Sequence, residues 1–273
     1  MLPLHLALLA YVGAGVVYFV WLVRPRDALR RAAQNLLIAG AALHFASLAL
    51  EVSAGGARSL VHAGGSLSSL AFLIVFGFIA LDLRFQIPVA GAFVAPLVVA
   101  VLVPAHLVPD RASAVYGVGL AVHVGIAFLG TAVFALSFGL ALLFLVTERQ
   151  LKAKRLGRLA ARLPSLDLVD RMTWYLTLAG FVLLSLTIAS GAVYGRGASG
   201  LAPLDLKTTF AYVAWFTYAV VINARLSAGW RGRRAAVLVL AGFVLIVGVY
   251  LGVYRDAAAR TAVTSAASPV RPA

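Results

Sequence analysis

Two histidines lie inside apolar segments of this sequence, where an imidazole is energetically costly. His44 follows Leu-Ile-Ala-Gly-Ala-Ala-Leu, and His123 stands between Val-Gly-Leu-Ala-Val and Val-Gly-Ile-Ala-Phe. An ionisable side chain at membrane depth marks a functional site by default. Two neutral imidazoles at one level can occupy both axial positions of a haem iron. The residue types therefore predict a bis-histidine haem b site with His44 and His123 as the metal ligands.

The two histidines are predicted to lie at the same depth. The second apolar run reaches water eight residues beyond His44, and the fifth enters the membrane seven residues before His123. At about 1.5 Å per residue, each imidazole lies roughly 10–12 Å below the same surface. Two imidazoles that bind one iron must lie at the same depth, so this match fits a shared site.

Three further residues are candidates for contact with the same cofactor. Gly40 and Gly119 each precede a histidine by four residues and so share its helical face. A missing side chain there leaves room for a flat macrocycle. Trp215 lies deep in the seventh apolar run, where it either packs on a ligand or serves as a core aromatic.

Other interpretations of the histidines stay open. Each imidazole can instead hydrogen-bond a neighbouring helix or a buried water. A proton relay is a third interpretation, although the nearest acids, Glu51 and Asp82, fall at the ends of their runs. His62 and His106 lie in two outer connections, where they either cap the site or are simply solvated.

The elements that must position these residues are membrane helices. Of the 273 residues, 63% are hydrophobic and 12% are charged, against about 45–50% and about 25% in soluble domains. Each span needs roughly 20 apolar residues. The sequence predicts an all-α, polytopic transmembrane helical bundle over residues 1–256, with a disordered tail over 257–273. About eight spans are expected, near residues 4–23, 34–52, 67–83, 87–103, 116–146, 174–194, 206–226 and 235–254.

The positive charges orient this bundle. Sixteen of the 23 lysines and arginines fall in one alternating set of connections, and seven fall in the opposite set and the tail. Since cytoplasmic connections carry the excess of Lys and Arg, the N-terminus and C-terminus are both expected outside. The net charge of +14 therefore reflects topology and anionic membrane lipids rather than nucleic acid. Leucines recur among the bases of the Glu148–Arg171 connection, which is either a solvated loop whose charge sets the topology or a segment lying on the anionic membrane surface.

The sequence excludes several kinds of chemistry. There is no cysteine, which excludes disulfides, thiolate metal sites and covalent c-type haem attachment. Phosphate-binding loops, nucleophile elbows and zinc-protease motifs are also absent from the sequence. We therefore expect a protein that is not an enzyme.

Several stretches in consistent order resemble the cytochrome c assembly family of membrane proteins (CcsA/ResC-like), in its HemX-like or YpjD-like branch. They are Leu43-His44, Val122-His123-Val124-Gly125, Thr147-Glu148-Arg149-Gln150-Leu151-Lys152-Ala153-Lys154, Leu163-Pro164-Ser165-Leu166, Val213-Ala214-Trp215-Phe216-Thr217-Tyr218 and Gly229-Trp230-Arg231-Gly232-Arg233-Arg234-Ala235. The likeness covers roughly residues 34 to 254.

The resemblance implies a haem-binding bundle of the bacterial cytoplasmic (inner) membrane, involved in cytochrome c biogenesis or in regulating haem supply. For the HemX-like branch it also implies an effect on glutamyl-tRNA reductase, with the Glu148–Arg171 connection and the Arg231–Arg234 turn as the contact surface. Two features depart from the haem-exporting members. Their tryptophan-rich outer segment ends in Trp-Asp-Pro-Lys-Glu, of which Asp205 and Lys207 remain here, and Asn223 stands where they have a late histidine.

The alternative is a cofactor-free accessory or regulatory subunit of a membrane transporter. That reading predicts a colourless protein that co-purifies with a partner. A transporter in its own right is disfavoured, because no interrupted spans recur in matching halves and no carboxylate lies at mid-membrane.

Overall fold

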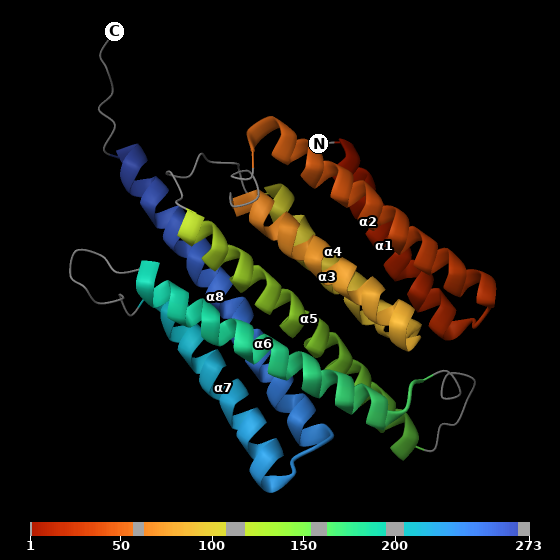
Figure 1. The fold of residues 1–273 in the computed structure, drawn as a ribbon. Coiled ribbons are helices and arrows are strands. Elements are labelled where there is room, and N and C mark those ends of the chain that lie inside the picture. Colours follow the sequence, from red (N-terminus) through yellow and green to blue (C-terminus); the bar gives the residue numbers. More distant parts are fainter. Residues whose placement is uncertain (1, 57–62, 108–117, 154–162, 195–204, 267–273) are drawn as a thin grey trace.

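The computed structural model of the protein describes residues 2–56, 63–107, 118–153, 163–194 and 205–266 (Figure 1). Helices account for all the regular structure in these residues. The predicted all-α class and helical bundle are confirmed. The elements are α1 (Leu2–Val23), α2 (Asp27–Gly55), α3 (Ala63–Phe85), the short 3-10 helix η2 (Pro88–Ala90), α4 (Gly91–Leu107), α5 (Val118–Lys152), α6 (Leu166–Tyr194), α7 (Leu206–Ala228) and α8 (Arg233–Ala266).

Consecutive helices form antiparallel pairs, α1 with α2, α3 with α4, α5 with α6 and α7 with α8. The pairs are joined where α1 packs on α4, α3 packs on α2 and α5, and α8 packs on α5. Figure 1 shows α3 and α4 between α2 and α5, with the α1–α2 and α7–α8 turns at the same end of the bundle. We call this the basic end. Its described cations are Arg24, Arg26, Arg30, Arg31, Arg84, Arg149, Lys152, Arg171, Arg225, Arg231, Arg233 and Arg234.

Seven of the eight described α-helices are long and apolar enough to cross a membrane, and α7 falls outside this criterion. The reason lies in its composition, because α7 includes Lys207, Thr208, Thr209, Asn223 and Arg225. It nevertheless pairs with α8 along its length (Figure 1). Its 23 residues make about 35 Å of helix, enough to match its neighbours. The placement of both termini outside remains a prediction.

The connection between α3 and α4 is as tight as the sequence suggests. Gln86 adopts a positive φ of 54°, and its backbone N–H donates to the carbonyl of Asp82 at 2.9 Å. α4 then starts close against α1, since a Cβ added at Gly91 would lie 2.6 Å from the Tyr18 ring. A larger residue at Gly91 would therefore push α4 away from α1.

The end of α8 differs from the sequence expectation. The helix continues to Ala266, so residues 257–266, expected to be disordered, are helical, and 267–273 lie outside the described residues. The physical reason is the high helix propensity of alanine, which recurs at Ala257, Ala258 and Ala259. Small and polar residues with prolines favour disorder over the tail, but an alanine-rich segment at its start can extend a helix that has already been nucleated.

Asp205 starts α7 as its N-cap. Its carboxylate accepts from the backbone N–H of Thr208 at 2.9 Å and pairs with Lys207 at 2.8 Å. Burial raises the pKa of Asp205, but the hydrogen bonds from Lys207 and Thr208 outweigh it and leave that pKa below its ordinary value. This gives a structural role to the two residues that remain of the outer motif.

We expect Asp205→Ala to lower the free energy of unfolding by about 1 kcal/mol, because it removes the cap of α7. Asp205→Asn should retain most of the stability, since asparagine caps a helix nearly as well. Because the folded-state pKa is depressed, the ionic part of this stability is present above the ordinary Asp pKa and is lost as pH falls through the folded value. Thermal melts in detergent at neutral and acidic pH measure both effects. Equal melts for the wild type and the alanine variant at neutral pH would contradict the capping role.

Candidate functional site

His44 lies fully buried between α1, α2 and α3. Its Nδ1 is hydrogen-bonded to the Tyr11 hydroxyl at 3.2 Å, and its Nε2 to the Ser68 hydroxyl at 2.9 Å. The Phe72 ring contacts the imidazole edge-on, with centroids 5.6 Å apart. Both ring nitrogens therefore have protein partners in this arrangement, and the burial of the imidazole is compensated.

Gly40 provides space for Tyr11. A Cβ added at Gly40 would lie 2.8 Å from Tyr11 Cε1 and 3.1 Å from the Cβ of Ala10. The absence of a side chain on this face of α2 thus lets α1 approach closely and places the Tyr11 hydroxyl on His44. In this arrangement a tyrosine ring occupies the space that the sequence suggested for a macrocycle.

His123 lies near the start of α5, half-buried against α6. Its Nδ1 is 2.8 Å from Ser190 Oγ, and that hydroxyl donates to the carbonyls of Leu186 at 2.8 Å and Thr187 at 3.1 Å. The single Ser190 hydroxyl proton thus has two carbonyl acceptors besides Nδ1, and when it points to either of them Ser190 Oγ accepts from Nδ1–H. The neutral imidazole then carries its lone pair on Nε2, the form that binds metals.

The edge of the same ring touches α6 where that helix has no side chain. A Cβ added at Gly191 would lie 3.2 Å from His123 Cε1. Gly191 therefore allows a close approach of α5 to α6, and the imidazole makes this contact. Gly119 lies in the first turn of α5, one helical turn before His123.

The structure places the two histidines at similar depth but in different parts of the bundle. A Cβ at Gly77 of α3 would lie 2.8 Å from Leu136 of α5, which fixes the register of two helices that run in the same direction (Figure 1). Ser68, and with it His44, is then level with position 127 of α5. His123 is four residues away, or about 6 Å along the axis. However, α3 lies between α2 and α5, so the two rings do not share one pocket.

The other candidates are also separated from His123. Trp215 is 36% exposed, its Nε1–H donates to Ser185 Oγ at 2.9 Å, and its ring lies 5.4 Å from that of Phe181. Ser185 and Ser190 are five residues apart on α6 and so point in different directions. His62 lies outside the described residues. His106 is in the last turn of α4, and its side chain lies outside the described set.

Sequence reasoning missed the partners Tyr11, Ser68 and Ser190. Each stands in an apolar helix, where a hydroxyl can also bond its own backbone, so type and position carry no signal of a tertiary partner. Ser190 beside Gly191 was the one available sign, because a hydroxyl next to a missing side chain marks a place where another helix can come close.

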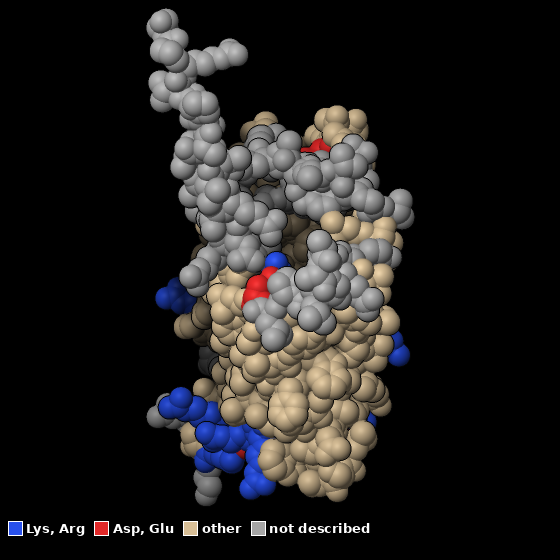
Figure 2. All heavy atoms as spheres, turned by 90° about the vertical axis from the view of Figure 1, so that its left-hand side faces the viewer, with Lys and Arg blue, Asp and Glu red and all other residues tan. Residues whose placement is uncertain are grey.

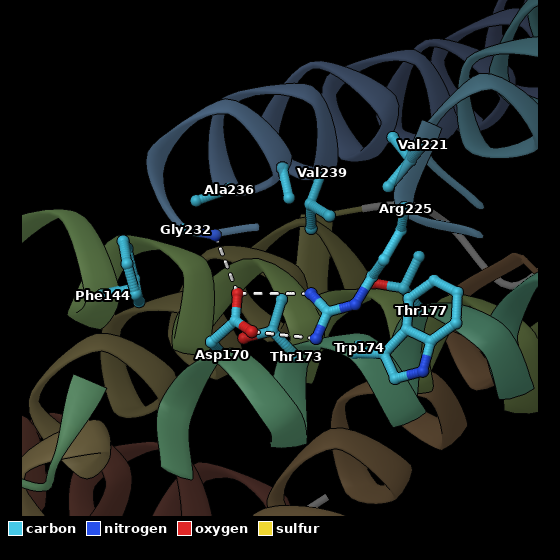
Figure 3. Close-up of a pocket in the computed structure, with 11 residues that line it drawn as sticks. Phe144, Asp170, Thr173, Trp174, Thr177, Val221, Arg225, Gly232, Ala236 and Val239 are labelled. Atoms are coloured by element: carbon cyan, nitrogen blue, oxygen red, sulfur yellow. Dashed lines mark hydrogen bonds and ion pairs between the residues drawn. The ribbon is translucent and has the colours of Figure 1, made fainter. Parts of the chain in front are cut away.

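A second polar centre lies at the basic end (Figure 3). Asp170 of α6 is 8% exposed, and its two oxygens accept from both terminal nitrogens of Arg225, at 2.8 and 3.3 Å. It also accepts from Arg231 Nε at 3.3 Å and from the backbone N–H of Gly232 at 2.9 Å. The Arg225 guanidinium lies 4.8 Å from the centre of the Trp174 ring. We call these five residues the Asp170 clasp.

The Asp170 clasp is built for structure rather than for ligand binding. The adjoining cavity has a volume of only about 10 Å³, about that of one water. Asp170 is fully hydrogen-bonded, so it has no free capacity to accept a substrate proton. Within the described ranges no group of three or more His, Asp or Glu side chains is placed to hold a metal ion.

Comparisons with known proteins agree with this architecture. The sequence profile of the family described as "Cytochrome C assembly protein" matches residues 5–255. "Inner membrane protein YpjD" of Escherichia coli (strain K12) is 29% identical over 256 residues, covering 90% of this chain and 94% of that protein.

Two other similarities cover less of the related protein. "Cytochrome c biogenesis protein CcsA" of Prochlorococcus marinus (strain MIT 9312) is 42% identical over 86 residues, or 31% of this chain and 28% of that protein. The solved structure "Cytochrome c Heme Lyase CcmF" matches with a TM-score of 0.66 at 14% identity, covering 93% of this chain and 48% of that one. The matched region thus spans less than half the length of either protein, and the structural match shows the fold.

Proposed function

The chain belongs to the cytochrome c assembly protein family, and from this premise we propose that it handles haem b in the bacterial cytoplasmic membrane, with His123 and His44 as the iron ligands. The predicted family is confirmed, and the full-length similarity to an inner membrane protein supports the location. We propose the role of an assembly or haem-supply factor rather than an enzyme.

The observation that carries this proposal is the hydrogen bond from His123 to Ser190. Histidines that bind metals almost always donate their other ring N–H to a fixed acceptor, which sets the tautomer and the ring orientation. His123 can do this through Nδ1, which lies 2.8 Å from Ser190 Oγ, and in that tautomer Nε2 is unprotonated. The residues present therefore fit an axial ligand at this position.

His44 is proposed as the second ligand, which requires a change in the surroundings of its ring. Its two nitrogens are held by Tyr11 and Ser68, and α3 lies between α2 and α5 (Figure 1). Ligation of one iron by both histidines therefore requires one of these bonds to break and α3 to move aside. Haem, when bound, supplies an iron whose redox behaviour follows from its axial ligands and their burial. We restrict the proposed site to His123, His44 and Gly119, because protein side chains occupy the places beside Gly40 and Trp215.

We propose a cytoplasmic haem-biosynthesis enzyme, glutamyl-tRNA reductase, or a cytochrome c assembly factor as the partner. The contact surface would be the Glu148–Arg171 connection, of which residues 154–162 lie outside the described part. The Arg231–Arg234 turn, included from sequence, is less suited to this role, because Arg231 is bound to Asp167 and Asp170.

An absorption spectrum of the detergent-purified protein, oxidised and then reduced with dithionite, tests the proposal. We expect a red-shifted Soret band and resolved α and β bands on reduction, the signature of low-spin haem with two strong axial ligands. A colourless protein, even after haem is supplied during expression, would contradict the proposal. It would favour the cofactor-free accessory subunit instead.

A further inference from the structure

An open hollow of about 490 Å³ lies at the start of α8, at the basic end. It is lined by Trp230, Arg233, Arg234, Val237 and Leu238. The hollow thus combines two guanidinium groups and an indole with two aliphatic side chains. It is far from His123 and His44, which lie toward the opposite end of the bundle.

The two arginines of the hollow differ from the nearby Arg225 and Arg231 in their ion pairing. Arg225 and Arg231 form ion pairs with Asp170. Arg233 and Arg234 are exposed, and neither forms an ion pair with a carboxylate in the described part of the chain. Arg234 lies 5.7 Å from the centre of the Trp230 ring, which orients its guanidinium without neutralising it. Figure 2 shows Lys and Arg side chains gathered at this end of the molecule.

The order of charged and apolar side chains along α8 matches the order of the headgroup and hydrocarbon layers of a membrane. Arg233 and Arg234 lie in the first turn of a helix whose residues 233–252 are apolar enough to span the bilayer. Val237 and Leu238 lie four residues further on the same face, about 6 Å deeper. Val237 is 48% exposed, so this face is open to the surroundings. The hollow therefore places positive charge at headgroup level and apolar surface directly below it.

We propose that this hollow binds an anionic phospholipid. The phosphate would be held by Arg233 and Arg234, which suit phosphate through charge and fork geometry. The acyl chains would lie along Val237 and Leu238, and the Trp230 indole would lie at the interfacial level where tryptophan is enriched. A soluble anion would use only the charged half of the hollow, and an acidic protein would have to cover side chains that face the lipid.

Native mass spectrometry of the full-length protein tests this site. The protein is mixed in detergent with phosphatidylglycerol, cardiolipin or phosphatidylcholine, as wild type and as the R233Q/R234Q variant. The matched control is R24Q/R26Q, which removes two exposed arginines and the same charge from the same end. For two arginines at a membrane surface we expect R233Q/R234Q to lose about 30-fold in affinity for the anionic lipids. R24Q/R26Q should bind them like the wild type, and phosphatidylcholine should bind weakly throughout.

Three results would overturn the proposal. Unchanged binding in R233Q/R234Q would show that the hollow takes no lipid. Equal losses in both double variants would show that only net charge matters. Displacement of bound lipid by inorganic phosphate at millimolar concentration would show that the site recognises phosphate and not a lipid. Unchanged melting temperatures of both variants without added lipid verify that the fold is intact, and the outcome is independent of whether haem is bound.

Discussion

His123→Ala should remove most of the haem absorbance per mole of protein, because it deletes the imidazole that we propose as an iron ligand. His123 is half-buried, and its ring contacts α6 at Ser190 and beside Gly191. Truncation there should leave the bundle folded. The measurement is the Soret absorbance relative to protein, together with a thermal melt that checks folding.

Ser190→Ala tests whether the Ser190 hydroxyl orients the His123 ring, separately from the binding of iron by that ring. It keeps His123 but removes the acceptor of its Nδ1–H, and the loss of such a partner typically lowers metal affinity by about 10–100-fold. Ser185→Ala is the matched control, since Ser185 lies on the same helix and bonds Trp215 instead. Equal haem affinity in the wild type and Ser190→Ala would contradict the role that we assign to this hydrogen bond.

The spectrum of His44→Ala tests the second ligand. If His44 completes the site, this variant should change a low-spin spectrum to a high-spin one, since one axial position is lost. An unchanged low-spin spectrum would assign His44 to the packing of α1, α2 and α3, in which its ring bonds Tyr11 and Ser68. The His123 result can be interpreted whichever outcome is found for His44.

Asp170→Asn is expected to be the most destabilising single change at the basic end. It leaves Arg225, whose side chain is 12% exposed, without its counter-charge. Removing one partner of a buried ion pair typically costs about 3–5 kcal/mol. The loss should appear as a large fall in melting temperature in detergent, because a buried, unpaired guanidinium is poorly solvated.

The matched control is Asp167→Asn, one helical turn earlier on α6. Asp167 pairs with Arg171 and Arg231, but its side chain is 59% exposed, so the expected loss is only about 0–1 kcal/mol. A double variant with Asp170→Leu and Arg225→Met should recover much of the stability, since apolar residues can replace a buried pair. Similar melting temperatures for the two single asparagine variants would show that burial is not what makes Asp170 important.

The fold was largely predictable because membrane helices are specified by local composition. Spans were placed by runs of apolar residues, and the connection containing Gln86 was recognised as tight from its shortness. α7 was expected to span like the rest, although Lys207, Asn223 and Arg225 make it less apolar than its neighbours. The end of α8 was missed because hydropathy says nothing about the helix propensity of alanine.

The two candidate histidines could be singled out from the sequence, but their surroundings could not. The cost of burying an imidazole singles out His44 and His123 from sequence alone. Which helices face each ring depends on tertiary packing, and the sequence does not reveal it. Depth could be estimated along each helix to within about one turn. The lateral position of each helix in the bundle could not be estimated, so α3 was not expected between the two histidines. The pairing of Asp170 with Arg225 was equally hidden, since a charge near a membrane surface is usually solvated.

The Asp170 clasp sets an order of events during synthesis. The two helices of each hairpin, α1–α2, α3–α4, α5–α6 and α7–α8, pair most closely, so each hairpin can assemble soon after its second helix is made. Asp170, however, precedes Arg225 by 55 residues, and Gly232 comes later still. At about 5–20 residues per second, the carboxylate waits roughly 3–11 s for its first arginine. During that interval it has to stay hydrated at the membrane surface, so the last hairpin to emerge is the one that completes the interactions at the start of α6.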